Sequence, residues 1–295
     1  MVASGLFSIQ EINSHGEKKD TSLPVEQVCE ASFNSSFDGF VGYQGELHHR
    51  IDILIAGSGQ FRLGQREVSI KAGEMLWSLK GSHPSLVDLD HSSLLIRIDL
   101  PIVLAMELKL CRSFELDLFC GKVFSLAVCN DLERQQLLRQ TEELKAKDEV
   151  MKEIALEELK LLLRRLSQYA SRRPHLADME PVRERGCYQV YKMVLFISDN
   201  FREELSVEKI AGHVGLHKNF AMNLFKKIMG QSLLEFTTSL RIRYAEKLLL
   251  NTQENITSIA YASGFSSLTR FYEVFGRHFG DSPQRYRKRC WYQDL

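Results

Sequence analysis

The chain has 295 residues, of which 44% are hydrophobic and 26% charged, a composition that is typical of globular proteins and excludes a wholly disordered or collagen-like chain. At roughly 100–200 residues per domain, this length predicts about two domains. The net charge is zero, with 38 Lys and Arg against 38 Asp and Glu, which argues against a nucleic-acid partner unless the total hides a split between segments.

Neither a signal peptide nor a membrane span is expected. The first residues hold no basic region and no long apolar run. The most apolar stretch, residues 94–110, is interrupted by charged residues and a proline, so we expect it in a protein core. The six cysteines include no C-x-x-C pair, which favours reduced thiols in a cytoplasmic protein.

Residues 1–130 contain short β-type runs separated by glycines. The clearest runs cover residues 50–56, 60–63, 67–70 and 94–100. Several short strands at near-regular spacing predict a β-sandwich or barrel.

Residues 131–170 contain no glycine or proline, and their apolar residues recur at helical spacing. This pattern predicts one or two amphipathic helices with a break near Lys147 and Asp148. The helices either cap the β-domain or pair with a second copy of the chain, and both uses are compatible. Residues 171–187 are polar, hold two prolines and are interpreted as a linker.

The zero net charge conceals two segments of opposite sign. Residues 188–290 carry 15 Lys and Arg against 9 Asp and Glu, a net charge of +6. Residues 1–187 carry a net charge of −5. A basic, helical C-terminal domain is the electrostatic pattern expected of a protein that binds phosphates.

That basic domain contains an approximate internal repeat, residues 206–229 and 256–279. Each copy has Ile-Ala, a glycine four residues after the Ala, an apolar residue, and a Phe ten or eleven residues beyond the glycine. This order predicts two helix-turn-helix units. The helix between them, expected over 233–251, would be roughly 30 Å long, close to the ~34 Å between successive major-groove half-sites on one face of DNA.

Individual residues of the repeat have predicted roles. We expect Ser206 and Thr257 to cap the first helix of each unit, and Gly215 and Gly264 to form the turns with left-handed backbone. Gly230 and Gly280 are expected to end the second helices. The side chains expected on the buried side of the second helices are Phe220, Leu224, Phe225, Phe271, Val274 and Phe275.

Residues 188–289 resemble the AraC/XylS family of bacterial transcription regulators. The matching motifs in the first half are Ile210-Ala211 with Gly215-Leu216, Phe225-Lys226 before Gly230, and Arg241-Ile242-Arg243-Tyr244-Ala245. In the second half they are Ile259-Ala260, Gly264-Phe265-Ser266-Ser267, Phe271, Phe275, and Gly280 with Ser282-Pro283-Gln284-Arg285-Tyr286-Arg287. Within the family, Phe220-Ala221-Met222 and Arg270-Phe271-Tyr272 resemble the melibiose-operon regulator type.

The resemblance implies a set of DNA-contacting residues on the second helix of each unit. The side chains expected to read bases are Asn219, Met222, Asn223, Ser267, Leu268, Thr269, Tyr272 and Glu273. The side chains expected to contact phosphates are Lys218, Lys226, Lys227, Arg241, Arg243, Arg270 and Arg277. Two alternatives stay open: Glu273 either accepts from a cytosine amino group or pairs with Arg270 or Arg277. Arg241 and Arg243 either contact phosphates or form structural ion pairs with Glu235 or Glu246.

The N-terminal strands resemble the cupin-like effector domain of this family. Residues 46–52 occupy the place of the cupin pattern His-x-His-x3-4-Glu, and residues 73–83 fit the second motif. Glu46 stands where the first His belongs, and Asp52 stands where the Glu belongs. The side chains expected in an effector pocket are Glu46, His48, Asp52, Trp77 and His83. Glu46, His48, Asp52 and His83 would form a mixed metal site only if they converge, and we favour polar pocket or surface roles without metal. Trp77 either stacks on a sugar ring or packs in the core.

The sequence therefore predicts an α+β protein of two domains: a cupin-like β-barrel with amphipathic helices, and an all-α domain with two helix-turn-helix units. The predicted function is a cytoplasmic, bacterial, homodimeric activator of a carbohydrate-utilisation operon. Its predicted partners are double-stranded DNA, RNA polymerase and a small-molecule effector such as a sugar, with no cofactor, catalytic residue or membrane partner. The alternative is a cupin-type metal-dependent enzyme, an isomerase or dioxygenase, with an accessory helical domain.

Overall fold

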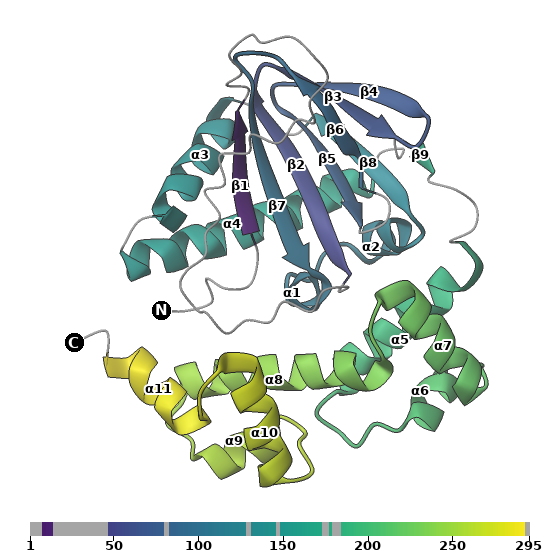
Figure 1. Cartoon of the computed structure of the whole chain (residues 1–295), viewed down its shortest axis with the longest axis vertical. Coiled ribbons are helices and arrows are strands. Elements are labelled where there is room, and N and C mark those ends of the chain that lie inside the picture. Colours follow the sequence, from purple (N-terminus) through teal and green to yellow (C-terminus); the bar gives the residue numbers. More distant parts are fainter. Residues whose placement is uncertain are drawn as a thin grey trace, which may run out of the picture. The chain divides into compact units, whose positions relative to one another are not determined.

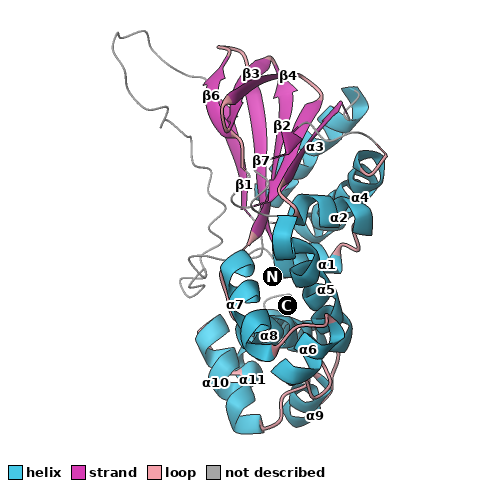
Figure 2. Ribbon diagram, turned by 90° about the vertical axis from the view of Figure 1, so that its right-hand side faces the viewer, coloured by secondary structure: helices cyan, strands magenta, loops and turns pink. Residues whose placement is uncertain are grey.

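The computed structural model describes residues 8–13, 47–79, 83–127, 131–145, 148–172, 177–178 and 184–292 (Figure 1). Within these residues the chain divides into two compact units, with the boundary at Gly186. The N-terminal unit is rich in strands and the C-terminal unit is helical (Figure 2). None of the helices in the described ranges has the length and apolarity that a membrane span requires.

The strands of the N-terminal unit form two antiparallel sheets. The larger sheet has the order β1 (Ser8–Asn13), β7 (Leu94–Pro101), β2 (His48–Ala56), β5 (Glu74–Leu79), β8 (Lys122–Ala127) and β9 (Ala177–Asp178). The smaller sheet has the order β4 (Arg66–Lys71), β3 (Ser58–Leu63) and β6 (Ser85–Leu89). The strands predicted over 50–56, 60–63, 67–70 and 94–100 are confirmed as β2, β3, β4 and β7.

The two sheets pack as an open sandwich, and the prediction of a barrel is wrong. Leu54 and Leu95 of the larger sheet share one core cluster with Phe61 and Ile70 of the smaller sheet. No hydrogen-bonded ladder joins the sheets in the described ranges, so neither closes on itself. The chain changes sheets at Gly57, which has a φ of 75° and leaves no room for a Cβ beside Ser93.

The opposite face of the larger sheet is covered by helices (Figure 2). Trp77 of β5 contacts Phe114 of α2 (Arg112–Phe119) edge to face, with ring centroids 4.8 Å apart. The Cys111 amide donates to the Ser167 hydroxyl of α4 at 3.1 Å. Helix α1 (Ile102–Glu107) follows directly on β7. This face is therefore a closed apolar core.

Residues 131–170 form α3 (Asp131–Lys145) and α4 (Glu149–Ala170). Asp148 caps α4 by accepting hydrogen bonds from the amides of Val150 and Met151 at 3.0 and 3.1 Å. The stretch interpreted as a linker is partly structured: β9 pairs with β8, and α5 begins at Glu184. Backbone pairing at an open sheet edge accounts for β9, because a strand there needs no apolar pattern of its own.

The C-terminal unit places two pairs of helices along α8 (Leu233–Asn251) (Figure 1). The first pair is α6 (Val207–His213) and α7 (Lys218–Met229), and the second is α9 (Ile256–Ala262) and α10 (Leu268–Phe279). Helix α5 (Glu184–Asn200) precedes them and α11 (Pro283–Tyr292) follows them. The helix predicted over 233–251 is confirmed with those bounds.

Local chemistry explains where these helices start. The Ser206 hydroxyl accepts from the amide of Lys209 at 3.1 Å, which confirms its predicted capping role. The prediction for Thr257 is wrong, since Asn255 caps α9 by accepting from the amide of Ser258 at 2.7 Å. Asn is at least as good an N-cap as Thr, and α9 begins one residue before Thr257.

Glycines terminate or turn the helices as predicted. Gly230 and Gly280 end α7 and α10 with φ values of 75° and 69°. Gly215 and Gly264 have φ values of 70° and 85° at the turns between the paired helices. These conformations are strained for any residue that carries a Cβ.

Each helix pair has its own apolar core. At the first pair, the buried ring of Phe225 in α7 lies 5.6 Å from the buried ring of Phe236 in α8. In the second, Phe265, Phe271 and Phe275 form the centre of a cluster that α8 and α11 complete. The prediction that Phe220 is buried is wrong, because its side chain is 57% exposed.

Candidate nucleic-acid interface and ligand site

Helix α7 is buried on one side only. Ala221, Phe225 and Met229 face the core, at the four-residue spacing of a helix stripe. The remaining surface is exposed and carries the predicted contact residues of the first unit. These exposed residues are Lys218, Asn219, Met222, Asn223, Lys226 and Lys227. Among them, Lys218 contacts Glu208 of α6 at 3.0 Å.

Helix α10 presents a comparable surface with a different charge arrangement. Thr269 and Tyr272 are exposed, whereas Leu268 is half-buried against the core of the second pair. The hydroxyl of Ser267 accepts from the amide of Arg270 at 3.2 Å and so caps the helix. The Ser267 hydroxyl therefore has a structural role as the N-cap of α10.

Glu273 forms ion pairs with both neighbouring arginines. Its carboxylate lies 2.9 Å from Nη1 of Arg270 and 2.6 Å from Nη2 of Arg277. The hydrogen bond and charge of Arg270, followed by Arg277, lower the pKa of Glu273. The structure thus contains the ion-pair alternative that the sequence left open.

The Arg241 side chain of α8 is hydrogen-bonded to backbone carbonyl groups. Its Nε donates to the carbonyl of Phe201 at 2.6 Å, and its Nη2 donates to the carbonyl of Glu203 at 2.8 Å. These bonds hold the segment between α5 and α6 against α8. Arg241 thus has structural hydrogen bonds to carbonyl groups, and its partners in them are neither Glu235 nor Glu246.

Arg243 is also structural, as the alternative allowed. Its side chain is buried and lies 3.3 Å from Glu246, whose other oxygen accepts from the Tyr286 hydroxyl at 2.6 Å. Burial, with a smaller contribution from Glu246, raises the pKa of Tyr286. A buried guanidinium cannot reach a DNA backbone, so the predicted phosphate contact is wrong.

In the N-terminal unit, Trp77 lies in the core and not in a pocket. Its ring is fully buried, and its Nε1 donates to Nδ1 of His49 at 3.1 Å. Trp77 and His49 point to the helix-covered face, because residues alternate between the faces of a strand. Glu46 lies outside the described residues.

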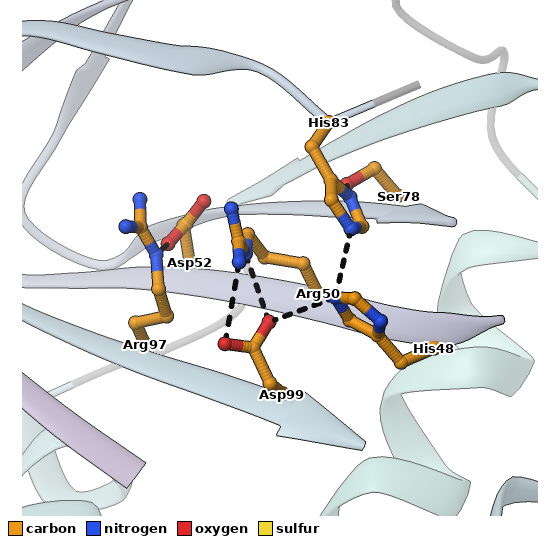
Figure 3. Close-up of polar contacts among 7 residues, drawn as sticks. All are labelled: His48, Arg50, Asp52, Ser78, His83, Arg97 and Asp99. Atoms are coloured by element: carbon orange, nitrogen blue, oxygen red, sulfur yellow. Dashed lines mark hydrogen bonds and ion pairs between the residues drawn. The ribbon is translucent and has the colours of Figure 1, made fainter. Parts of the chain in front are cut away.

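The inner face of the larger sheet carries a group of polar side chains, here named the inner-sheet cluster (Figure 3). The cluster consists of His48, Arg50, Asp52, Ser78, His83, Arg97 and Asp99. Antiparallel register places Arg50 opposite both Ser78 and Asp99, and Asp52 opposite Arg97. His48, Asp52 and His83 were predicted from the sequence, whereas Arg50, Ser78, Arg97 and Asp99 were missed. The signal for Arg50, Arg97 and Asp99 was the alternation of polar with apolar residues in β2 and β7.

The cluster is tied together by short polar contacts. Asp52 accepts from Nε of Arg97 at 2.7 Å, and Asp99 accepts from Nε of Arg50 at 2.8 Å. Nε2 of His83 lies 3.2 Å from Nε2 of His48, and its Nδ1 lies 2.9 Å from the Ser78 hydroxyl. The predicted residues His48, Asp52 and His83 are therefore brought together.

Burial and neighbouring charges shift the pKa values of two groups in the cluster, His83 and Asp52. Burial, reinforced by the charge of Arg50, lowers the pKa of His83 to about 2, so this ring is uncharged near pH 7. Burial raises the pKa of Asp52, and Arg97 opposes that rise. Oδ2 of Asp52 is buried without a hydrogen-bond partner among the described residues. In the same ranges, no three His, Cys, Asp or Glu side chains are arranged to hold a metal ion.

Comparison with known proteins identifies the helical unit. A protein-family model described as a helix-turn-helix domain matches residues 210–289, which span both helix pairs. The melibiose operon regulatory protein of Escherichia coli K12 is 27% identical over 244 residues, covering 81% of this chain and 80% of that protein. The chain carries an AraC-type helix-turn-helix domain. The resemblance expected from the sequence motifs is thus confirmed.

Two further matches accompany this AraC-type domain. The lactose operon transcription activator of Staphylococcus xylosus is 33% identical over 92 residues, covering 31% of this chain and 33% of that protein. A solved regulator with an AraC-type DNA-binding domain from Chromobacterium violaceum is 30% identical, covering 35% of this chain and 92% of that chain, with a TM-score of 0.33. The sequence matches support a DNA-binding transcription regulator and give no support to the cupin-type enzyme.

Proposed function

We propose that the chain is a sequence-specific activator of a carbohydrate-utilisation operon, controlled by a neutral small molecule that binds the N-terminal unit. The observation that carries the proposal is the repeat of α6–α7 and α9–α10 along α8, each with one buried and one exposed face. In a helix-turn-helix, the second helix enters the major groove. The operon regulators named among the sequence relatives support carbohydrate control.

In this proposal α7 and α10 enter successive major grooves. Helix α8 has 19 residues and is roughly 30 Å long, which suits the ~34 Å between half-sites. Asn219, Met222 and Asn223 read bases in the first groove, and Thr269 and Tyr272 do so in the second. Lys218, Lys226, Lys227, Arg270 and Arg277 supply positive charge toward phosphates.

The inner-sheet cluster is the proposed effector site. The cluster holds two arginines and two aspartates, so it offers no excess of either sign to compensate the charge of an ionic ligand in a partly buried site. The unpartnered Oδ2 of Asp52 can accept a hydrogen bond from a ligand hydroxyl, which would remove the cost of a buried, unpaired acceptor. A neutral molecule with several hydroxyl groups, such as a sugar, has this chemistry.

A second copy of the chain is the proposed partner of α4. Val150, Ile154 and Leu161 form an exposed apolar stripe, at 66%, 44% and 61% exposure. Along the stripe, the exposed residues are acidic toward the N-terminus, at Glu153, and basic toward the C-terminus, at Arg164. An antiparallel pair of α4 helices therefore matches opposite charges across an apolar seam. A dimer would also present two DNA-binding domains to the DNA. At the promoter, the proposed protein partner is RNA polymerase.

A binding map of the full chain on genomic DNA tests the function. We expect a few enriched sites upstream of genes for sugar uptake or breakdown. Calorimetric titration of neutral sugars from that pathway should give binding to the wild type and much weaker binding to Asp52→Asn, while their phosphorylated forms should not bind. Uniform DNA coverage without enriched sites would refute sequence-specific regulation, and preferential binding of the phosphorylated sugars would refute the assignment of the neutral ligand.

A further inference from the structure

Phe220 occupies an unexpected place in the first helix pair. It lies in the first turn of α7, yet its side chain is 57% exposed. Phe is among the residue types most often buried, yet this ring stands on the polar face of the helix. On both sides along the helix it is flanked by exposed polar residues that are proposed to read bases, Asn219 and Asn223.

The repeat supplies an internal comparison for this position. Helices α7 and α10 have 12 residues each and both end at a left-handed glycine, so they align without a gap. Phe220 then corresponds to Arg270, Asn223 to Glu273, and Lys227 to Arg277. In α10 these three positions form a closed Arg-Glu-Arg ion-pair group.

In α7 the corresponding face has no such internal pairing. Phe220 cannot form an ion pair, and α7 contains no acidic residue that could hold Lys227. The first turn of α7 therefore offers one exposed apolar ring, Phe220, among polar side chains. The two helices of the repeat present different chemistry to a groove, although their backbones are equivalent.

We infer that Phe220 is a specificity-determining residue that contacts the 5-methyl group of a thymine in the major groove, an inference that rests on the proposed DNA-reading role of α7. The N-terminal residues of a recognition helix are those that approach base edges. The thymine methyl is the apolar group displayed there, and Phe is one of the side chains that contact it. The face of α10, lined by charges, cannot make this contact at Arg270.

Binding of the full chain to a duplex that it enriches from random-sequence DNA tests the role of the ring. Phe220→Ala should weaken binding roughly tenfold, and Phe220→Leu should weaken it less because an apolar contact remains. Binding to a scrambled duplex, and the dependence of affinity on salt, should stay unchanged because no charge is removed. Leu234→Ala is the matched control: Leu234 is 67% exposed on α8 and is expected to leave binding unchanged.

Replacing single thymines by deoxyuridine, which lacks the 5-methyl group, then locates the contact. At one position or more, methyl removal should weaken the wild type and leave Phe220→Ala unaffected, while Leu234→Ala follows the wild type. The inference is refuted if Phe220→Ala binds the duplex like the wild type, as expected if the ring contacts a protein partner instead of DNA. It is also refuted if every deoxyuridine substitution weakens the wild type and Phe220→Ala equally. If the wild type enriches no duplex at all, the proposed sequence-specific function fails together with it.

Discussion

Arg241 offers a direct test of whether a basic residue in a DNA-binding domain is structural. Replacing it by Met removes two charge-assisted hydrogen bonds, of 2.6 and 2.8 Å, to the carbonyls of Phe201 and Glu203. Such bonds contribute roughly 1.5–3 kcal/mol each. Because the Arg241 side chain is only half-buried, we take the low end of that range for both bonds and expect a loss of about 3 kcal/mol in the free energy of unfolding.

The assay combines urea denaturation with DNA binding over a range of salt concentrations. Arg241→Met should lower the denaturation midpoint, while the slope of log affinity against log salt stays that of the wild type. Lys226→Ala is the matched comparison, since Lys226 is exposed and proposed to contact phosphate. It should leave stability unchanged and reduce the salt slope by about one. A reduced salt slope with unchanged stability for Arg241→Met would refute its structural role.

Three further predictions concern base reading, the backbone and pH. Asn223→Ala should weaken specific binding by about 1–3 kcal/mol in gel-shift titration and leave a scrambled duplex unaffected; equal losses on both would contradict base reading. Gly264→Ala should lower the melting temperature strongly, because φ is +85° and the Cβ would lie 2.8 Å from two carbonyl oxygens. Gly212→Ala, whose Cβ meets nothing within 4 Å, is the control, and equal effects would refute the packing argument. Burial and Arg243 lower the pKa of His278 to about 4, against 6.5 for an unperturbed His. The unfolded chain therefore binds this proton more readily, so the stabilisation is present above pH 6.5 and about 3 kcal/mol of it is lost as pH falls to 4. In denaturation curves across that range, His278→Gln should weaken the dependence of the free energy of unfolding on pH. An unchanged dependence would contradict the role assigned to His278.

The inner-sheet cluster illustrates what sequence motifs could and could not predict. His48 and Asp52 were singled out because they stand in a recognisable pattern on one strand. Arg50, Arg97 and Asp99 were missed because their significance depends on the register between β2 and β7, which pairs residues 45 and 49 positions apart. For Trp77 the sequence left two alternatives open, stacking on a sugar and packing in the core, and the helices that cover one face of β5 place it in the core.

The C-terminal unit was largely readable from its sequence, since its signals are local. Helix periodicity, the cap at Ser206 and the glycines at 215, 230, 264 and 280 act within a few residues, and they predicted the bounds of α8 and the two helix pairs. Tertiary structure decided which charged and apolar side chains of these helices remain exposed for contact with DNA. It buried Arg243 beside Glu246, bound Arg241 to backbone carbonyls, and left Phe220 exposed. These outcomes depend on contacts between residues far apart in the chain, and exposure is a property of the packed structure that no single segment specifies.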